Sequence, residues 1–433
     1  MIEPALVVVV LLGLIAIGAP IFLALGASGL LGLYMARGPL AFFFGPTSLF
    51  GQLNSFELLA LPLFVLMGNL LAATPVGRNL FRAAVAWLHW LRGSLAISTV
   101  GAATVFGAVS GVSIAGVAAV GSIAVPQMLD RGYSRTLAAG SVVASGALAM
   151  LIPPSVPLII YGAVSSVSVA DLFIGGIVPG LALALSLALY IYVRVRLHPE
   201  EAPPYDGPPV TWGERMRSLG GIWHAMALIA FVLGVIYSGL ATPSEAAAFG
   251  ALGAFVIATL VFRALDARGV LRVLGQSARV SGAILLIMGC ARIFGDYLNL
   301  VRVPDAITAA LVGTDLPPEA ILILVMLVLV GLGMLVDAVS LIVVTTPILL
   351  PLITTLGYDP LWFGIILVMN LEIAVITPPV GLNLYTLKAV VPTLRLEEII
   401  RSVVPFVLVQ FALLIVFVLF PSISLWLPNL VRQ

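Results

Sequence analysis

Long apolar runs separated by short polar turns make up most of the chain. A helix needs about 20 apolar residues to cross a hydrocarbon core roughly 30 Å thick, which predicts about nine full spans and two helical hairpins. The pattern indicates an all-α polytopic membrane protein. The predicted spans are 4–36, 55–75, 134–168, 171–197, 221–240, 243–262, 280–300, 359–391 and a final run that ends near residue 430, and the predicted hairpins are 94–129 and 317–356.

Three segments depart from the pattern of upright spans. The run 4–36 is too long for one upright helix, so we expect Pro20 to break it or to let it tilt. The segment 76–93 alternates arginines with Phe and Trp, which is typical of a helix lying in the headgroup plane. A second arginine-rich segment, 263–279, precedes the span at 280–300, and we interpret the two segments as counterpart arms.

Composition supports the membrane assignment and excludes several other classes. Hydrophobic residues make up 61% of the 433 positions and charged residues only 9%, against about 25% in a soluble domain. The net charge is +1, with no dense basic cluster, so nucleic acid is not an expected partner. The single cysteine, Cys290, excludes an intrachain disulfide and a cysteine zinc site. The N-terminal MIEPALVVVVLLG lacks a basic leader and a cleavage site, so we expect an uncleaved first helix.

A set of helix-breaking residues occurs twice in the chain. Pro126, Gly132, Tyr133, Pro153 and Pro154 reappear 225 residues later as Pro351, Gly357, Tyr358, Pro378 and Pro379. The turn after the first hairpin carries two arginines, whereas the equivalent turn of the second copy carries only an aspartate. Because short cytoplasmic loops collect basic residues, we expect the two copies to be inverted. This assignment places 130–135, 198–218, 263–279 and 388–401 inside, with Arg37 and Arg302 as exceptions.

The paired prolines interrupt both predicted broken spans at membrane depth. Proline cannot donate a backbone hydrogen bond, so carbonyls upstream are freed and a new half-helix begins downstream. Free carbonyls can bind a cation, and a helix N-terminus suits an anion. Inverted repeats with interrupted helices bind substrate and coupling ions where the halves meet.

Small polar residues gather at both hairpin tips. In the first, GAVSGVSIAG supplies Ser110, Gly111 and Ser113, and we assign a cation site to Ser110, Ser113, Ser145 and Gly146. Close packing of small residues is the alternative explanation.

In the second tip, Asp337 is one residue from the counterpart of Ser113, and a carboxylate at mid-bilayer is functional by default. Asn370, Thr377, Gly381 and Asn383 offer further oxygens facing it, beside Pro378. The buried acid Glu372 either tunes this second site or pairs with an arginine.

Neither repeat offers an arginine fork for an anionic substrate. Basic residues are absent from 136–193 and from 303–387, so the half-helix dipoles and bound cations would have to balance a carboxylate. We therefore expect carboxylate binding to depend on the coupling ion. The substrate-binding residues that we expect at the tips and half-helix N-termini are Ser110, Gly111, Pro154, Ser155, Pro379, Gly381 and Asn383.

Other conspicuous residues have simpler interpretations, and no enzyme motif is present. Thr242 and Glu245 are expected to cap a helix, and Arg292 and Asp296 to form a local ion pair. The only lysine, Lys388, does not follow a glycine, which excludes a Walker A loop. An intramembrane aspartyl protease using Asp296 and Asp337 lacks a required glycine at Ile293.

Essentially the whole chain resembles the large membrane subunit of tripartite ATP-independent periplasmic (TRAP) transporters, the DctM family. The motifs that carry the resemblance are SFELLALPLFVLMGNL (55–70), ATVFGAVSGVSIAGVAAVGSIAVPQM (103–128), LIPPSVPLIIYG (151–162), ATPSEAAAFGA (241–251), GMLVDAVSLIVVTTPILLP (333–351) and NLEIAVITPPVGLNLY (370–385).

The resemblance implies a sodium-driven importer of organic acids that works as an elevator in a bacterial or archaeal cytoplasmic membrane. It implies two partners, a small four-helix membrane subunit and a periplasmic binding protein. It carries two sodium sites onto Ser110, Ser113, Ser145 and Gly146, and onto Gly333, Asp337, Asn370 and Thr377. The alternative is a stand-alone sodium/anion symporter of the same broad fold that needs no binding protein.

The expected organisation alternates frame and transport segments. Residues 1–93, 171–316 and 392–433 are assigned to frame helices and arms, and residues 94–170 and 317–391 to two transport repeats, each with a hairpin and a broken helix.

Overall fold

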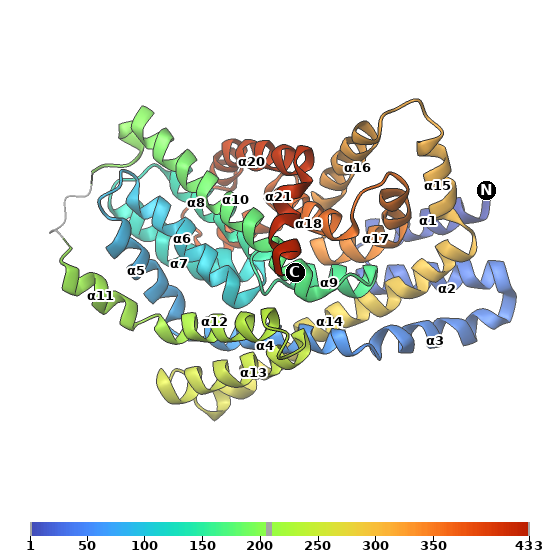
Figure 1. Ribbon diagram of the computed structural model, residues 1–433, viewed down its shortest axis with the longest axis horizontal. Coiled ribbons are helices and arrows are strands. Elements are labelled where there is room, and N and C mark those ends of the chain that lie inside the picture. Colours follow the sequence, from blue (N-terminus) through green and yellow to red (C-terminus); the bar gives the residue numbers. More distant parts are fainter. Residues whose placement is uncertain (1, 205–209, 432–433) are drawn as a thin grey trace.

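The computed structural model describes residues 2–204 and 210–431, and within these ranges the chain is helical with no strand. Seven of the described helices are long and apolar enough to cross a membrane, and nine if each of two sharply bent helix pairs is counted as one span. This confirms the all-α polytopic architecture. Figure 1 shows the hairpins and broken helices gathered above the long helices α12, α3 and α14.

The order of elements repeats along the chain with the offset of 225 residues. In the first half the elements are α1 (Ile2–Ala16), α2 (Ile21–Arg37), α3 (Ala41–Leu53), α4 (Ala60–Ala72), α5 (Val76–Leu88), α6 (Ser94–Ser110), α7 (Ser113–Asp130), α8 (Arg135–Ala147), α9 (Val156–Ser165) and α10 (Val169–Leu197). Their counterparts are α12 (Trp223–Tyr237), α13 (Pro243–Val256), α14 (Ala267–Leu300, which matches α3 and α4 together), α15 (Val303–Val312), α16 (Pro318–Gly333), α17 (Ala338–Thr355), α18 (Pro360–Ile376), α19 (Leu382–Val390) and α20 (Leu396–Leu419). The whole described chain is therefore a duplication, apart from the connecting α11 (Trp212–Gly220) and the terminal α21 (Pro421–Val431).

Both predicted hairpins and both predicted broken helices are present. Helices α6 and α7 form the first hairpin and α16 and α17 the second, while α8/α9 and α18/α19 are the broken pairs. The broken helices form the core, because α18 is buried from Leu361 to Ile376 and α8 from Leu137 to Ala147. Each hairpin packs against the broken helix of the other repeat, α7 against α19 and α17 against α9. The two repeats are thus joined at the centre.

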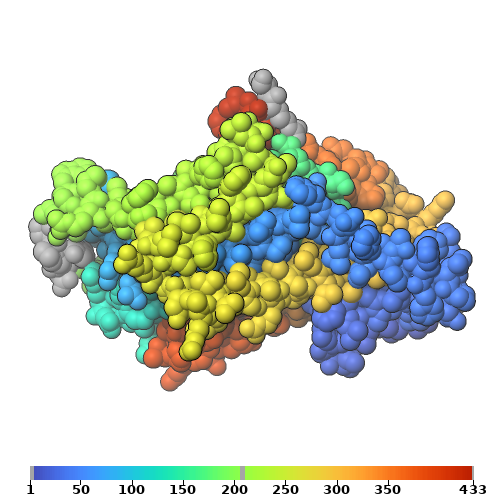
Figure 2. All heavy atoms as spheres, turned by 90° about the horizontal axis from the view of Figure 1, so that it is seen from below, coloured from blue at the N-terminus to red at the C-terminus, as the bar shows by residue number. Residues whose placement is uncertain are grey.

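Helices α2, α4, α13 and α14 pack against one another, whereas α10 and α20 pack on the broken helices and on each other. Helix α2 packs against α14, and its counterpart α13 packs against α4. Glycine permits the close approach of α2, since a Cβ added at Gly29 would lie 2.7 Å from the Phe294 backbone nitrogen. Figure 2 shows these helices covering the lower face of the molecule, with α2, α3 and α4 in blue and α12, α13 and α14 in green to yellow.

The interpretation of 76–93 and 263–279 as counterpart arms was wrong. The offset pairs α5 with α15, and it pairs the arginine-rich start of α14 with α3. Helix α5 also packs its buried residues against α6. The segment 263–279 is not separate from the span that follows, because α14 is one continuous helix of 34 residues.

The first and the last predicted apolar runs are each interrupted by a helix break. Helix α1 ends at Ala16 and α2 begins after Pro20, so the first run is two packed helices, as the length of the run required. The final run was predicted as one helix, but it is interrupted between α20 and α21 at Phe420 and Pro421. Proline at the first position of α21 fits the interruption, since a proline disfavours the helical conformation of the residue before it, and Phe420 has φ −125° and ψ 71°.

Candidate functional site

The hairpin tips are short non-helical turns. In the first, α6 ends at Ser110 and α7 starts at Ser113, with Gly111 in the left-handed region at φ 62°. A residue with a side chain is strained there, which explains the glycine. The second tip is longer, from Met334 to Asp337, and it lies between α16 and α17.

The helix breaks lie at the two proline pairs, as predicted. Helix α8 continues as a 3₁₀ turn over Leu148–Met150, and the chain is then irregular until α9 begins at Val156. Helix α18 ends at Ile376, and α19 begins at Leu382. The peptide bonds Pro153–Pro154 and Pro378–Pro379 are both cis. The interruptions therefore share position and backbone form.

Each tip is hydrogen-bonded to the break of its own repeat. The backbone N–H of Val156 donates to the Gly111 carbonyl at 3.3 Å, and that of Val380 donates to the Met334 carbonyl at 3.2 Å. The approach at the first pair is close, because a Cβ added at Gly111 would lie 2.7 Å from the Pro154 carbonyl oxygen. Tip and break thus form one local unit in each repeat.

The two units meet at one cavity of about 140 Å³, which we call the tip cavity. Its walls come from both hairpin tips, both breaks and one side of α14. The lining includes Gly111, Ser113, Met150, Val156, Val280, Ile284, Asp337, Val339, Val375 and Leu382. Of the predicted site residues, the structure brings Gly111, Ser113 and Asp337 to the cavity. Ser110, Ser155, Gly381 and Asn383 are next to lining residues in the chain. The other predicted residues are not part of the lining: Ser145, Gly146, Pro154, Gly333, Asn370, Thr377 and Pro379.

The oxygens of the first predicted cation site are buried near the first tip. The hydroxyl of Ser110 has no hydrogen-bond partner among the described residues. Ser145 Oγ donates to the Ser141 carbonyl at 2.6 Å, which leaves its lone pairs free. The carbonyl oxygen of Gly146 faces α7, 3.4 Å from the position of a Cβ added at Gly116. These neutral oxygens are the donors that a hard alkali cation prefers.

The second predicted cation site contains an acid with a structural role. Asp337 is the N-cap of α17, since its carboxylate accepts from the Ser340 amide at 3.0 Å and from the Ser340 hydroxyl at 2.5 Å. Asn370 Nδ2 donates to the Met326 carbonyl of α16 at 3.1 Å, and its Oδ1 is left unpartnered among the described residues. Thr377 Oγ1 donates to the Ile373 carbonyl at 2.5 Å. Gly333 lets α16 approach α18, because an added Cβ would lie 2.6 Å from Ala374.

Glu372 and Asn383 are also fully buried without hydrogen-bond partners among the described residues, as are side chains on other elements such as Ser28 and Ser98. Glu372 forms no ion pair in the described part of the chain, so pairing with an arginine was a wrong alternative. The other alternative, in which Glu372 tunes the second site, stays a prediction. Across the described ranges, no three His, Cys, Asp or Glu residues form a cluster that could hold a metal ion.

Sequence reasoning missed the wall that α14 contributes, Val280 and Ile284. Two apolar residues within an apolar span carry no signal that would separate them from lipid-facing neighbours. The predicted helix cap and the predicted local ion pair were both confirmed. Thr242 and Glu245 form a capping box, and Arg292 Nε lies 3.0 Å from Asp296 Oδ1.

Comparison with known proteins decides the family. The family described as "Tripartite ATP-independent periplasmic transporter, DctM component" matches residues 8–423. The chain belongs to the DctM family. It is the large permease component of a TRAP transporter and, like the rest of that bacterial family, a multi-pass membrane protein.

Several DctM-type relatives are similar over most of the chain. The C4-dicarboxylate TRAP transporter large permease protein DctM of Vibrio cholerae is 33% identical, over 98% of this chain and 97% of the relative. An ectoine/5-hydroxyectoine TRAP transporter large permease protein of Ruegeria pomeroyi is 31% identical, over 96% of each chain. The isethionate TRAP transporter permease protein DctMQ of Oleidesulfovibrio alaskensis is 34% identical over 95% of this chain, which spans 64% of that relative.

Two solved transporter structures share the fold of this DctM chain. The YdaH transporter of Alcanivorax borkumensis aligns with a TM-score of 0.62 at 14% identity, over 89% of this chain and 90% of that chain. MtrF of Neisseria gonorrhoeae aligns with a TM-score of 0.53 at 16% identity, over 91% of this chain and 85% of that chain. At these identities the likeness concerns the fold alone.

Proposed function

We propose that this DctM chain carries an organic acid across the bacterial cytoplasmic membrane by sodium-coupled symport. The observation that carries the proposal is the tip cavity, where both hairpin tips and both interrupted helices meet. Irregular backbone at membrane depth is tolerated where it is buried in protein or lines a cavity. The lining is mostly apolar, and its polar side chains, Ser113 and Asp337, both come from the hairpin tips.

Sodium is a co-transported substrate in this proposal, and it binds behind each tip. The first site comprises Ser110, Ser113, Ser145 and Gly146, and the second Gly333, Asp337, Asn370 and Thr377. The buried, unpartnered Ser110 Oγ and Asn370 Oδ1 support this assignment, because a buried polar atom without a partner is costly unless a ligand binds it.

The carboxylate of the substrate binds where the half-helices begin, at Ser110, Gly111, Pro154, Ser155, Pro379, Gly381 and Asn383. Helix α19 suits this role because Gly381, at its N-cap, provides no side-chain cap. No Lys, Arg or His is among the residues that line the tip cavity. Sodium must then supply the positive charge, so carboxylate binding depends on it.

The transport cycle is an elevator movement of the two repeats, 94–170 and 317–391, against the frame. A small four-helix membrane subunit holds the frame, and a periplasmic binding protein delivers the substrate. The relatives support the substrate class, since they include transporters for C4-dicarboxylate, isethionate and sialic acid.

Uptake in liposomes that contain the membrane subunits tests the proposal. The binding protein and a panel of organic acids are added outside, with and without an inward sodium gradient. We expect uptake of at least one acid only with both the gradient and the binding protein. Uptake driven by a proton gradient alone would contradict sodium coupling, and uptake without the binding protein would favour a stand-alone sodium/anion symporter.

A further inference from the structure

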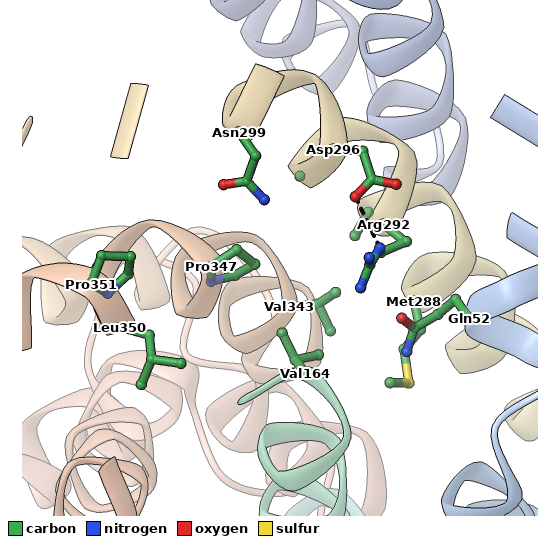
Figure 3. Close-up of a pocket in the computed structure, with 12 residues that line it drawn as sticks. Gln52, Val164, Met288, Arg292, Asp296, Asn299, Val343, Pro347, Leu350 and Pro351 are labelled. Carbon is green, nitrogen blue, oxygen red and sulfur yellow. Dashed lines mark ion pairs between the residues drawn. The ribbon is translucent and has the colours of Figure 1, made fainter. Parts of the chain in front are cut away.

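A second cavity, larger than the tip cavity, lies near the C-terminal end of α14. Its volume is about 270 Å³, and it separates α14 and α3 of the frame from α17 of the second hairpin. Its polar lining is Gln52, Arg292, Asp296 and Asn299, and it faces Val343 and Pro347. Figure 3 shows these side chains of α14 directed toward α17. We call this cavity the outer crevice.

Arg292 has hydrogen-bonding capacity to spare in the outer crevice. Its Nε pairs with Asp296 Oδ1 at 3.0 Å, while its two terminal nitrogens have no partner among the described residues. The side chain of Arg292 is 56% exposed and that of Asp296 29% exposed. A guanidinium with free terminal nitrogens binds a carboxylate in a bidentate manner. An incoming carboxylate can therefore bind beside Asp296 or replace it.

A second arginine lies near the outer crevice, with its guanidinium 5.7 Å from the centre of the Phe44 ring. Arg37, at the end of α2, lines an adjoining hollow together with Ser48, Asp296 and Leu300. Arg37 is one of two basic residues that the charge distribution of the loops leaves on the outer side. The same distribution places the end of α14 on that side, where a substrate arrives. Two arginines against one aspartate leave an excess of positive charge, which attracts anions.

One side of α14 connects the outer crevice with the tip cavity. Val280 and Ile284 line the tip cavity, and Met288, Arg292 and Asp296 line the outer crevice. Their spacing of four residues places neighbours on the same side of a helix. At 1.5 Å per residue, Ile284 and Arg292 are about 12 Å apart along the axis. The linings of the two cavities therefore follow one another along α14, about two helical turns apart.

We propose that the outer crevice is an anion-binding vestibule, in which Arg292 receives the carboxylate of the transported acid before the acid moves to the tip cavity. The inference rests on the proposed function. Asp296 holds Arg292 in the absence of substrate and competes with the incoming carboxylate for it. Arg292 is therefore a positioning residue of the access path, separate from the sites at the tips.

The test compares two substitutions that break the same ion pair. In the liposome assay we use the acid that wild type takes up fastest from succinate, isethionate, pyruvate and N-acetylneuraminate. Arg292→Ala should raise KM about tenfold or more, because a charge-assisted contact to the carboxylate is lost. Asp296→Asn should lower KM, because the competitor for Arg292 is neutralised. Arg279→Ala, an exposed arginine on the same helix outside the crevice, is the matched control and should leave KM unchanged.

Opposite signs of the two KM changes are the signature of a vestibule. A purely structural ion pair would make both substitutions change KM in the same direction, and that result would overturn the proposal. An effect of Arg292→Ala no larger than that of Arg279→Ala would do the same. A KM change confined to vesicles with phosphatidylglycerol would assign Arg292 to a lipid phosphate instead. Failure of wild type to take up any acid would refute the proposed function itself.

Discussion

The two repeats share one backbone plan but differ in polar chemistry. In the first, Ser155 caps α9, accepting from the Leu158 amide at 3.3 Å and donating to the Met150 carbonyl, and the tip offers neutral serines. In the second, Val380 stands at the position of Ser155, α19 has no side-chain cap, and the tip carries Asp337. The interruptions thus lie at matching positions, but the polar groups beside them differ. The two sites should therefore differ in function.

The largest effect is expected at the acid that only the second tip carries. Asp337→Asn keeps an oxygen for the Ser340 amide, and Asn caps a helix as well as Asp does, but the negative charge is lost. We expect the apparent sodium affinity of uptake to fall about tenfold or more, with thermal stability nearly unchanged. Asp305→Asn, in the first turn of α15, is the control. If the variant depends on sodium as wild type does, Asp337 acts only as a helix cap.

The contact between tip and break can be tested in the first repeat with Gly111→Ala. The residue has φ 62°, and the new Cβ would lie 2.7 Å from the Pro154 carbonyl oxygen. We expect unfolding in detergent to become easier by about 2–3 kcal/mol, from backbone strain and overlap together. Gly357 in the second repeat has φ 84°, and a Cβ added there would have no atom within 4 Å. Gly357→Ala should therefore lower the free energy of unfolding by only about 1 kcal/mol. Equal losses would show that the tip does not depend on the break.

A smaller effect is expected from the cap that only the first break has. Ser155→Ala removes the acceptor for the Leu158 amide and should lower the free energy of unfolding by about 1 kcal/mol. Ser155→Thr keeps a capping hydroxyl and should recover most of the loss. Thermal unfolding of both variants measures this, and a Thr variant as unstable as the Ala variant would argue against the cap.

The smallest effect concerns an ion pair without a counterpart in the second repeat. Arg135 Nη1 lies 3.4 Å from Glu398 Oε2, with side chains 54% and 29% exposed, and Pro360 stands at the equivalent position. Exposed pairs of this kind are screened by solvent, so Arg135→Ala should cost no more than about 0.5 kcal/mol. Unfolding at low and high salt checks this, since a loss that persists in high salt cannot come from the ion pair.

Much of the fold could be predicted from the sequence because helix-breaking residues are conspicuous in an apolar chain. Pro153, Pro154 and their counterparts located both breaks, and the repeat offset located both hairpins. The arms could not be assigned in the same way. Helix α3 has no charged residue and looks like part of a span, whereas the arginines of 76–93 indicate an interface although that helix packs on the first hairpin.

The candidate site was predictable only where its residues are chemically unusual. Glycine, serine and aspartate stand out against Ala, Val and Leu, so Gly111, Ser113 and Asp337 were placed at the tips that line the cavity. Val280 and Ile284 were not, because an apolar residue facing a cavity and one facing lipid have the same identity. Only the packing of α14 against the second hairpin shows which of its apolar residues face the cavity and which face lipid.

The unbroken course of α14 ties transport to bilayer thickness. Arg279 and Arg292 are about 20 Å apart along this one helix, and long basic side chains extend toward the water-exposed surface. Because α14 is continuous and its first turns also carry Arg268 and Arg272, the depth of its N-terminal part as a whole, and not Arg279 alone, fixes how far Arg292 lies below the other surface. Lipids with longer acyl chains should bury the outer arginine and slow the delivery of anions, so membrane composition becomes a regulator of this carrier.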